Sequence, residues 1–319
     1  MCTITMMNKF ILLFFIFLVI LTTSITIPHN LVSLGVEGQT INNNNSNSNS
    51  NNENTLNVKD LVNSNTLHTN IQLQNKTVEY FDNASGYLVY PTISSSSSSS
   101  IDDNKQNNTN NSNNTFPAVI MIHENKGLND NIKNMANLLA KEGYVVLAVD
   151  LFNGEVTTTN QTRASELSQS IRDNPDVAIT NLKSAVKYLT TLPNVNPEKI
   201  ASLGWCFGGQ QSLQLALNSE DHPLSATVIY YGRLVTEPET LSKIKWPVLG
   251  IFGEKDQSIP VTTVEEFEDA LTKQGIINEI YIYKGVGHAF ANPSGENYSP
   301  NETKGAWQKT LVFLNKYLN

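Results

Sequence analysis

Short apolar runs alternate with amphipathic segments along the C-terminal two thirds of the chain. The run at 118–122 is continuously apolar, as expected of a strand that is buried on both faces. Similar runs at 144–149, 199–203, 226–231, 248–252 and 279–283 predict further strands. Helical spacing predicts helices at 132–141, 175–192, 261–274 and 303–318, with another opening after Cys206. Strands alternating with helices predict an α/β fold, with a mostly parallel central sheet covered on both faces.

A hairpin is predicted ahead of these elements. Residues 77–81 and 87–90 are short β-branched and aromatic runs on either side of Asn83-Ala84-Ser85-Gly86. Pro91 ends the second run, and the Ser/Asn-rich tract 92–115 is typical of a long, solvated insertion. We therefore expect one domain over residues 70–319 that carries this low-complexity insertion.

The N-terminal segment carries a targeting pattern. Residues 10–21 are an uninterrupted apolar run, preceded by Lys9 and followed by Thr22-Thr23-Ser24. This pattern predicts a signal peptide within 1–27, and the alternative is an uncleaved membrane anchor, since 10–27 approaches the minimum spanning length. Residues 28–69 are predicted to be an Asn/Ser-rich disordered linker. We expect an exported chain, either secreted or anchored by this segment to the outer face of the cell membrane.

Charge and cysteine content narrow the function. The 21 Lys and Arg against 29 Asp and Glu give a net charge of −8, and no basic cluster offers a face for nucleic acid. The two cysteines exclude a disulfide scaffold and a Cys-rich zinc module. Cys2 precedes the apolar run, so a cleaved chain keeps Cys206 as its thiol. The sequence indicates neither a metal ion nor an organic cofactor.

The strongest local motif surrounds Cys206. Gly204-Trp205-Cys206-Phe207-Gly208-Gly209 follows a predicted strand and opens a helix, which is the nucleophile-elbow pattern with Cys in place of Ser. The helix N-terminus favours a thiolate there, and the backbone N–H of Phe207 can bind a developing oxyanion. The alternative is a buried cysteine that only packs beneath the helix.

In folds with a nucleophile elbow, the orienting acid and then the histidine base follow the nucleophile along the chain. This sequence offers candidates for both. His288 lies in the glycine-rich loop Gly285-Val286-Gly287-His288 after the last predicted strand. Asp256 lies just past the strand at 248–252, at the edge of the sheet where ligands bind, and Glu254 is the second candidate. We expect His288 to move the proton and Asp256 to orient the imidazole.

Together these stretches resemble the dienelactone hydrolase family of α/β-hydrolases, from about residue 75 to the end. The matching motifs are Ile122-His123-Glu124-Asn125-Lys126-Gly127-Leu128, the segment 143–151, the segment around Cys206, Tyr230-Tyr231-Gly232, Gly253-Glu254-Lys255-Asp256 and Gly287-His288-Ala289-Phe290. The resemblance implies a Cys-His-Asp triad that cleaves small esters or lactones of the carboxymethylenebutenolide type. It also implies that Glu124 primes the thiol and that the N–H of Asn125 is the second oxyanion donor.

The chain departs from the family where founding members hold the substrate carboxylate with two arginines. One arginine would follow Asp150-Leu151-Phe152, where this chain has Asn153-Gly154, and the other position is occupied by Asn292. Arg233 and Arg163 are candidate replacements. We expect Trp205, Tyr231 and Arg233 to contact the substrate.

The sequence therefore predicts a hydrolase that acts on a small-molecule ester or lactone through a thioester on Cys206. A non-catalytic, surface-displayed binding module on the same fold is the alternative. A redox thiol protein is disfavoured, because the sequence contains no C-x-x-C motif and offers no resolving cysteine.

Overall fold

The computed structural model describes residues 71–93 and 115–319. The predicted signal peptide or anchor (1–27), the predicted linker (28–69) and nearly all of the predicted insertion lie outside these ranges. Among the helices of the described ranges, none is both long and apolar enough to cross a membrane.

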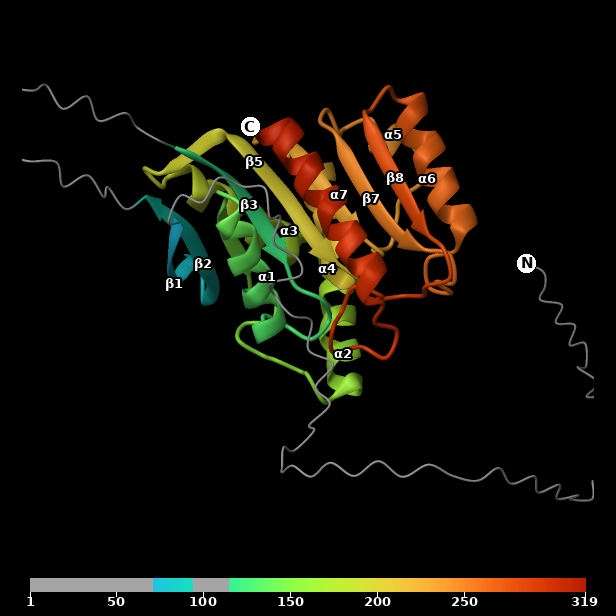
Figure 1. Cartoon of the computed structure of the whole chain (residues 1–319), viewed down its shortest axis with the longest axis horizontal. Helices are drawn as coiled ribbons and strands as arrows, with labels where there is room; N and C mark the ends of the chain where they lie inside the picture. Colours follow the sequence, from blue (N-terminus) through green and yellow to red (C-terminus); the bar gives the residue numbers. More distant parts are fainter. Residues whose placement is uncertain (1–70, 94–114) are drawn as a thin grey trace, which may run out of the picture. The chain divides into compact units, whose positions relative to one another are not determined.

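Eight strands form one sheet (Figure 1) in the order β1-β2-β4-β3-β5-β6-β7-β8. β1 pairs with β2 and β2 with β4 in antiparallel fashion, and all other pairs are parallel. The mostly parallel sheet that the sequence predicts is thus confirmed, with the hairpin at one edge. The strands are β1 (Ile71–Phe81), β2 (Ala84–Ile93), β3 (Phe116–Ile122), β4 (Val145–Val149), β5 (Val195–Trp205), β6 (Ala226–Tyr230), β7 (Val248–Gly253) and β8 (Asn278–Tyr283).

The helices cover both faces of the sheet. Buried side chains of α3, α4 and α6 pack on one face, and those of α1 and α7 pack on the other. The helices are α1 (Asp130–Lys141), α2 (Gln161–Asp173), α3 (Pro175–Thr190), α4 (Phe207–Leu217), α5 (Pro238–Leu241), α6 (Val261–Lys273) and α7 (Pro300–Leu318).

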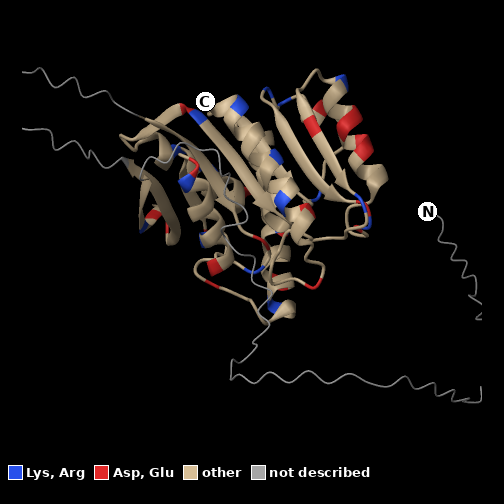
Figure 2. Cartoon of the chain, viewed as in Figure 1, with Lys and Arg blue, Asp and Glu red and all other residues tan. Residues whose placement is uncertain are grey.

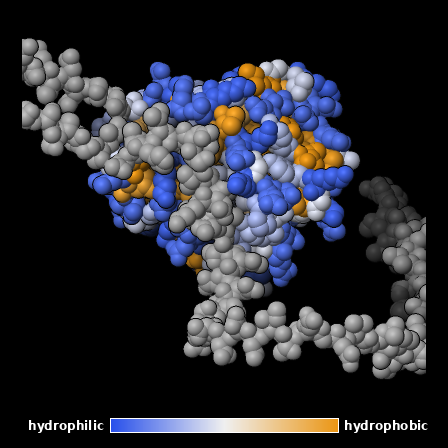
Figure 3. All heavy atoms as spheres, in the orientation of Figure 1, coloured by the Kyte–Doolittle hydropathy of each residue, from blue (hydrophilic) through white to orange (hydrophobic). Residues whose placement is uncertain are grey.

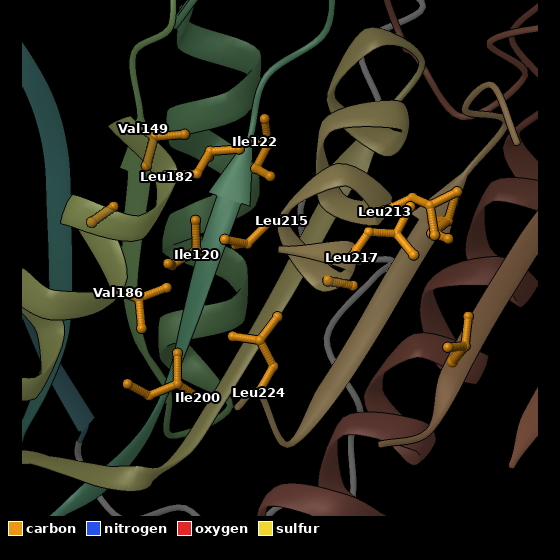
Figure 4. Packing of buried hydrophobic residues seen from close by; sticks show 14 of the residues in the cluster. Ile120, Ile122, Val149, Leu182, Val186, Ile200, Leu213, Leu215, Leu217 and Leu224 are labelled. Atoms are coloured by element: carbon orange, nitrogen blue, oxygen red, sulfur yellow. The ribbon is translucent and has the colours of Figure 1, made fainter. Parts of the chain in front are cut away.

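Strand side chains alternate between the two hydrophobic layers. On β3, Ile120 and Ile122 point to the layer shared with α3 and α4, whereas Val119 and Met121 point to the layer shared with α1 and α7. Figure 4 shows the first of these layers, where β3 packs against Leu182 of α3. Because both of its faces are buried, β3 is apolar at consecutive positions and not only at every second one.

The surface is mostly hydrophilic on the face seen in Figure 3, where hydrophobic residues form small separate areas. Lys and Arg are scattered over the described elements (Figure 2), while the outer helix α6 carries Glu265, Glu266, Glu268 and Asp269. This distribution agrees with the lack of a basic face in the sequence.

The structure corrects several expectations about elements. The strands of the hairpin are longer than predicted, since β1 begins at Ile71 rather than at residue 77, and Pro91 lies inside β2, which ends at Ile93. α2 was not predicted, because its sequence QTRASELSQSIRD is mostly polar and buries only Ala164 and Ser168. β5 begins at Val195 rather than at residue 199. The polar stretch Asn196-Pro197-Glu198 gives no strand pattern, so the start of β5 was not predicted. At this point the pairing of β5 with β3 also shifts register, between Phe116 and Ala118.

Candidate active site

Cys206 occupies the sharp turn between β5 and α4. Its φ of 54° and ψ of −116° lie in a region that residues with a side chain rarely adopt. A Cβ on Gly204 would lie 2.2 Å from the carbonyl oxygen of Gly208, and a Cβ on Gly208 would lie 2.3 Å from that of Ile122. The glycines therefore let α4 approach β5 and β3 closely, and the turn presents the thiol at the start of the helix.

His288 links Cys206 to Asp256. The Nε2 atom of His288 lies 3.1 Å from Sγ of Cys206, and its Nδ1 atom lies 2.8 Å from Oδ2 of Asp256. The other oxygen of the buried Asp256 carboxylate accepts the backbone N–H groups of Ser258 and Ile259 at 2.8 and 3.1 Å. The structure thus brings together three side chains that stand far apart in the sequence.

Glu254, the second candidate for the orienting acid, lies elsewhere. Its carboxylate accepts the backbone N–H of Gly285 at 2.8 Å, at the start of the loop that carries His288. Of the two acids, Asp256 is the one that contacts His288.

The hydrogen bonds of His288 stabilise its charged form. Burial alone lowers the pKa of His288, but the hydrogen bonds to Asp256 and Cys206 and their negative charges outweigh burial and raise it to about 10. Tyr231 packs edge-on against His288, with ring centroids 5.3 Å apart. Burial, reinforced by the charges of Glu124 and Cys206, holds the pKa of the Tyr231 phenol well above its usual value.

Glu124 lies at the end of β3 and is only 4% exposed. Burial raises its pKa to about 7, although Lys126, His288 and Asn292 all act in the opposite direction. One of its oxygens accepts a hydrogen bond from Nδ2 of Asn292 at 2.5 Å. The thiol of Cys206 is hydrogen-bonded to His288 instead. Asn292, which stands at a position where the family resemblance expects arginine, therefore holds the Glu124 carboxylate at the edge of the cavity that Cys206 also lines.

These residues open into a cavity of about 470 Å³. Both predicted oxyanion donors border it, and Phe207 is the first residue of α4, so its N–H is one of those that a helix leaves without an internal acceptor. The cavity is lined by Glu124, Asn125, Lys126, Gln161, Ser165, Ser168, Arg172, Cys206, Phe207, Gln210, Tyr231, Arg233, Ser258, Ile259, His288, Ala289, Asn292 and Gly295.

One wall of the cavity comes from α2. Gln161, Ser165, Ser168 and Arg172 follow one another at spacings of four, three and four residues, so they share one helix face. The side chain of Arg172 donates to Oε1 of Gln169 and to Oγ of Ser168. Burial and the nearby charge of Arg233 lower the pKa of Arg172. Arg172 was not among the predicted site residues because α2 itself was not predicted; the recurrence of polar residues at helical spacing is the signal that points to it.

The expected substrate contacts fall into two groups. Tyr231 and Arg233 line the cavity. Trp205 is 4% exposed and packs against Tyr230 with ring centroids 5.4 Å apart, so its location gives no support to a substrate contact. Arg163 is bonded to Glu155 at 2.6 and 2.9 Å and is not among the residues that line the cavity.

A metal ion has no ready set of ligands in the part of the chain that the structure describes. Within residues 71–93 and 115–319, no three His, Cys, Asp or Glu side chains are grouped so that they could hold one.

Comparison with known proteins gives a consistent result. The model of the dienelactone hydrolase family matches residues 107–318. A protein from Saccharolobus solfataricus named "Putative carboxymethylenebutenolidase" is 30% identical over 232 residues, which cover 62% of this chain and 89% of that protein. A "Probable 2-oxo-3-(5-oxofuran-2-ylidene)propanoate lactonase" from Bradyrhizobium sp is 28% identical, covering 63% and 84%.

The fold is also found among solved structures. A crystal structure from Klebsiella pneumoniae, described as a "Putative Dienelactone Hydrolase", is 24% identical with a TM-score of 0.62, covering 77% of this chain and 99% of that chain. Together with the sheet order, this likeness confirms the α/β-hydrolase fold that the resemblance implies.

Proposed function

Since the chain belongs to the dienelactone hydrolase family and is a hydrolase of the carboxymethylenebutenolidase-like kind, we propose that it cleaves a small ester or lactone through a thioester on Cys206. One observation carries this proposal. The thiol at the head of α4 is hydrogen-bonded to His288, which is hydrogen-bonded in turn to the buried carboxylate of Asp256. A nucleophile, a base and an orienting acid linked in this way are the components that acyl transfer requires.

In the first half of the reaction the sulfur of Cys206 attacks the substrate carbonyl carbon. A C–S bond forms, the carbonyl electron pair moves onto oxygen, and the thiol proton resides on Nε2 of His288. When the tetrahedral intermediate collapses, the C–O bond breaks and His288 returns the proton to the leaving alkoxide. Asp256 accepts the Nδ1–H of the imidazole throughout and keeps the ring oriented. The product of this half is a thioester and an alcohol, which stay in one molecule when the substrate is a lactone.

The second half uses water. His288 removes a proton from a water molecule that attacks the thioester carbonyl, the C–S bond breaks, and the sulfur leaves as a thiolate. The backbone N–H groups of Phe207 and Asn125 are the proposed donors to the oxyanion in both halves. Phe207 supplies a free helix-terminal N–H, and both residues border the same cavity as Cys206.

Glu124 is proposed to accept the thiol proton before substrate is attacked and to pass it on to Nε2 of His288, so that this is the proton that His288 later returns to the leaving alkoxide. Its buried carboxyl has a pKa of about 7, so it exchanges a proton readily at neutral pH, and it lines the cavity together with Cys206. This role follows from the family resemblance and is supported by the burial of Glu124.

The α2 wall suggests where an acidic substrate group would bind. Arg172 and Arg233 both line the cavity, and in the described part of the chain neither forms an ion pair with a carboxylate. Arg172 donates only to the neutral side chains of Gln169 and Ser168. Two guanidinium groups that are not ion-paired with a carboxylate there favour an anion, so we assign these arginines to a negatively charged group on the substrate.

The proposed function is tested by hydrolysis. The full chain and its Cys206→Ala variant would be compared on a panel of short-chain nitrophenyl esters and on a dienelactone. We expect turnover by the natural chain and none above background by the variant. Equal activity of the two proteins would contradict the proposal. A folded chain that is inert on the whole panel, with a thiol that iodoacetamide modifies slowly, would favour the binding module.

We also propose that the chain is exported. The apolar run 10–21 carries this proposal, and it lies outside the described residues. Expression in the native cell followed by separation of medium, membrane and cytosol would test it, and accumulation in the cytosol would contradict it.

A further inference from the structure

His123 is a buried residue that has no part in the mechanism above. It follows β3 directly, is fully buried, and is absent from the residues that line the cavity. Its ring packs against those of Phe152 and Phe207, with centroid distances of 4.7 and 5.9 Å, and those two rings also contact each other at 5.3 Å. Burial lowers the pKa of His123, although its contacts with Glu124 and Asp150 act in the other direction.

Both ring nitrogens of His123 are engaged by backbone groups. The N–H of Leu151 points to Nε2 at 3.1 Å, and Nδ1 lies 2.5 Å from the carbonyl oxygen of Glu124. A backbone N–H can only donate, so Nε2 is the acceptor. Nδ1 then carries the proton of the neutral ring and donates it to Glu124.

The carbonyl that His123 holds shares a peptide unit with the N–H of Asn125. In a trans peptide the C=O and the N–H point in opposite directions, so fixing the oxygen also fixes the direction of the hydrogen. The N–H of Gly127 donates to the same oxygen at 3.3 Å, and Oγ1 of Thr157 donates to the carbonyl of Asn125 at 3.2 Å. The carbonyl groups on both sides of Asn125 are therefore held while Asn125 itself borders the cavity.

The start of α4 packs against the same backbone segment, the one that contains His123. A Cβ on Gly208 would lie 2.5 Å from the carbonyl oxygen of His123, so α4 begins against the backbone of residue 123. The first turn of α4, which begins at Phe207, is thus packed against the backbone that leads into the Glu124–Asn125 peptide.

We propose that His123 is a positioning residue for the oxyanion site: its Nδ1–H orients the Glu124–Asn125 peptide so that the N–H of Asn125 faces the cavity beside that of Phe207. This inference rests on the proposed function, because the direction of that N–H matters only if Cys206 forms a tetrahedral intermediate. His123 acts through the peptide and does not touch the substrate.

Two substitutions separate this role from simple packing. In His123→Asn the side-chain amide nitrogen stands close to the position of Nδ1 and can still donate to Glu124. In His123→Leu the volume is filled without a donor. Neither side chain can replace Nε2 as the acceptor for Leu151, so the two variants share that loss and differ in the bond to Glu124.

Three quantities would be measured on the full chain: kcat, KM for a nitrophenyl ester, and the rate constant for alkylation of Cys206 by iodoacetamide. Alkylation displaces iodide at a saturated carbon and forms no oxyanion, so it reports on the thiolate and its access but not on the donors. Because misplacing an oxyanion donor acts on the transition state, we expect His123→Leu to lower kcat about 10- to 100-fold. KM and the alkylation rate should stay within about two-fold. His123→Asn should keep kcat within about five-fold of the natural chain.

Equal kcat values for the two folded variants, or a parallel fall of kcat and alkylation rate in His123→Leu, would overturn the inference. If His123→Leu does not fold, His123→Asn decides alone: a kcat within about five-fold of the natural chain supports the role, and a larger fall contradicts it. These results are distinct from failure of the proposed function, which an active Cys206→Ala variant would reveal whatever His123 does.

Discussion

Asn292 donates a hydrogen bond to the buried carboxylate of Glu124, which precedes it by 168 residues. The amide is neutral, so it orients the carboxylate without supplying a full positive charge to offset its burial. This pairing explains why burial still raises the pKa of Glu124 to about 7.

Glu124 should make the stability of the fold depend on pH. Between pH 4.5 and about 7 the folded chain holds a proton on Glu124 that the unfolded chain has lost, so stability falls as pH rises through this window. In Glu124→Gln that loss is absent, and the amide oxygen can still accept from Asn292. The free energy of unfolding of the variant, relative to that of the natural chain, should therefore rise by about 2 kcal/mol from pH 5 to pH 8. Urea unfolding of both proteins at pH 5 and at pH 8 measures this change. If the difference in unfolding free energy between them is the same at the two pH values, Glu124 does not have the raised pKa.

The orienting acid should affect rate more than folding. In Asp256→Asn, the side-chain oxygen can still accept from Ser258 and Ile259, but the amide nitrogen faces Nδ1 of His288 and favours the wrong tautomer. We expect kcat/KM to fall roughly 10²- to 10⁴-fold with little change in Tm. His288→Ala should cause a loss of similar size. An Asp256→Asn variant with full activity would show that this acid does not orient the base.

The close packing of α4 on β3 should leave no room at Gly208. A Cβ there would lie 2.3 Å from the carbonyl oxygen of Ile122, so Gly208→Ala must displace the helix and should cost about 2 kcal/mol or more. Gly305→Ala in α7 is the control, because its Cβ makes only ordinary contacts at 3.6 Å with Tyr283. There alanine should stabilise the helix by about 0.5–1 kcal/mol. Chemical denaturation of both variants measures whether Gly208→Ala lowers and Gly305→Ala raises the free energy of unfolding. Equal changes in the two variants would contradict the close packing at Gly208.

The arginine pair should select for substrate charge. We expect Arg172→Gln and Arg233→Gln each to lower kcat/KM about 10- to 100-fold for an ester with a carboxylate in its acid part, the range for lost charge-assisted hydrogen bonds. For a neutral ester of the same size the change should stay within about three-fold. Arg163→Gln is the control, since Arg163 is bonded to Glu155 outside the cavity. Equal losses on both esters would contradict an anion site.

The parts of the fold that the sequence predicts are those with a local physical cause. Continuous apolar runs mark β3 and β4 because both faces of the sheet are buried. Gly204 and Gly208 reveal the turn at Cys206 because nothing larger fits there. The neighbouring α2 gives no apolar pattern of this kind, since it buries little and faces the cavity with polar residues.

The parts that the sequence does not predict depend on contacts between distant segments. Asn292 was recognised as a departure from the family, but its bond to Glu124 joins a loop after β8 to the end of β3. The bond between His123 and the backbone of Leu151 likewise joins the ends of two neighbouring strands. Such pairs follow from the sheet order and the loop paths, which local patterns do not fix.

The thioester on Cys206 is the central claim, and trapping it is the most direct test. The full chain would be mixed with a nitrophenyl ester that deacylates slowly, quenched with acid within the first turnover, and analysed by intact and peptide mass spectrometry. We predict one acyl group per chain, located on the peptide that contains Cys206, and none in Cys206→Ala. An acyl group on another residue, or steady hydrolysis in Cys206→Ala, would contradict the mechanism.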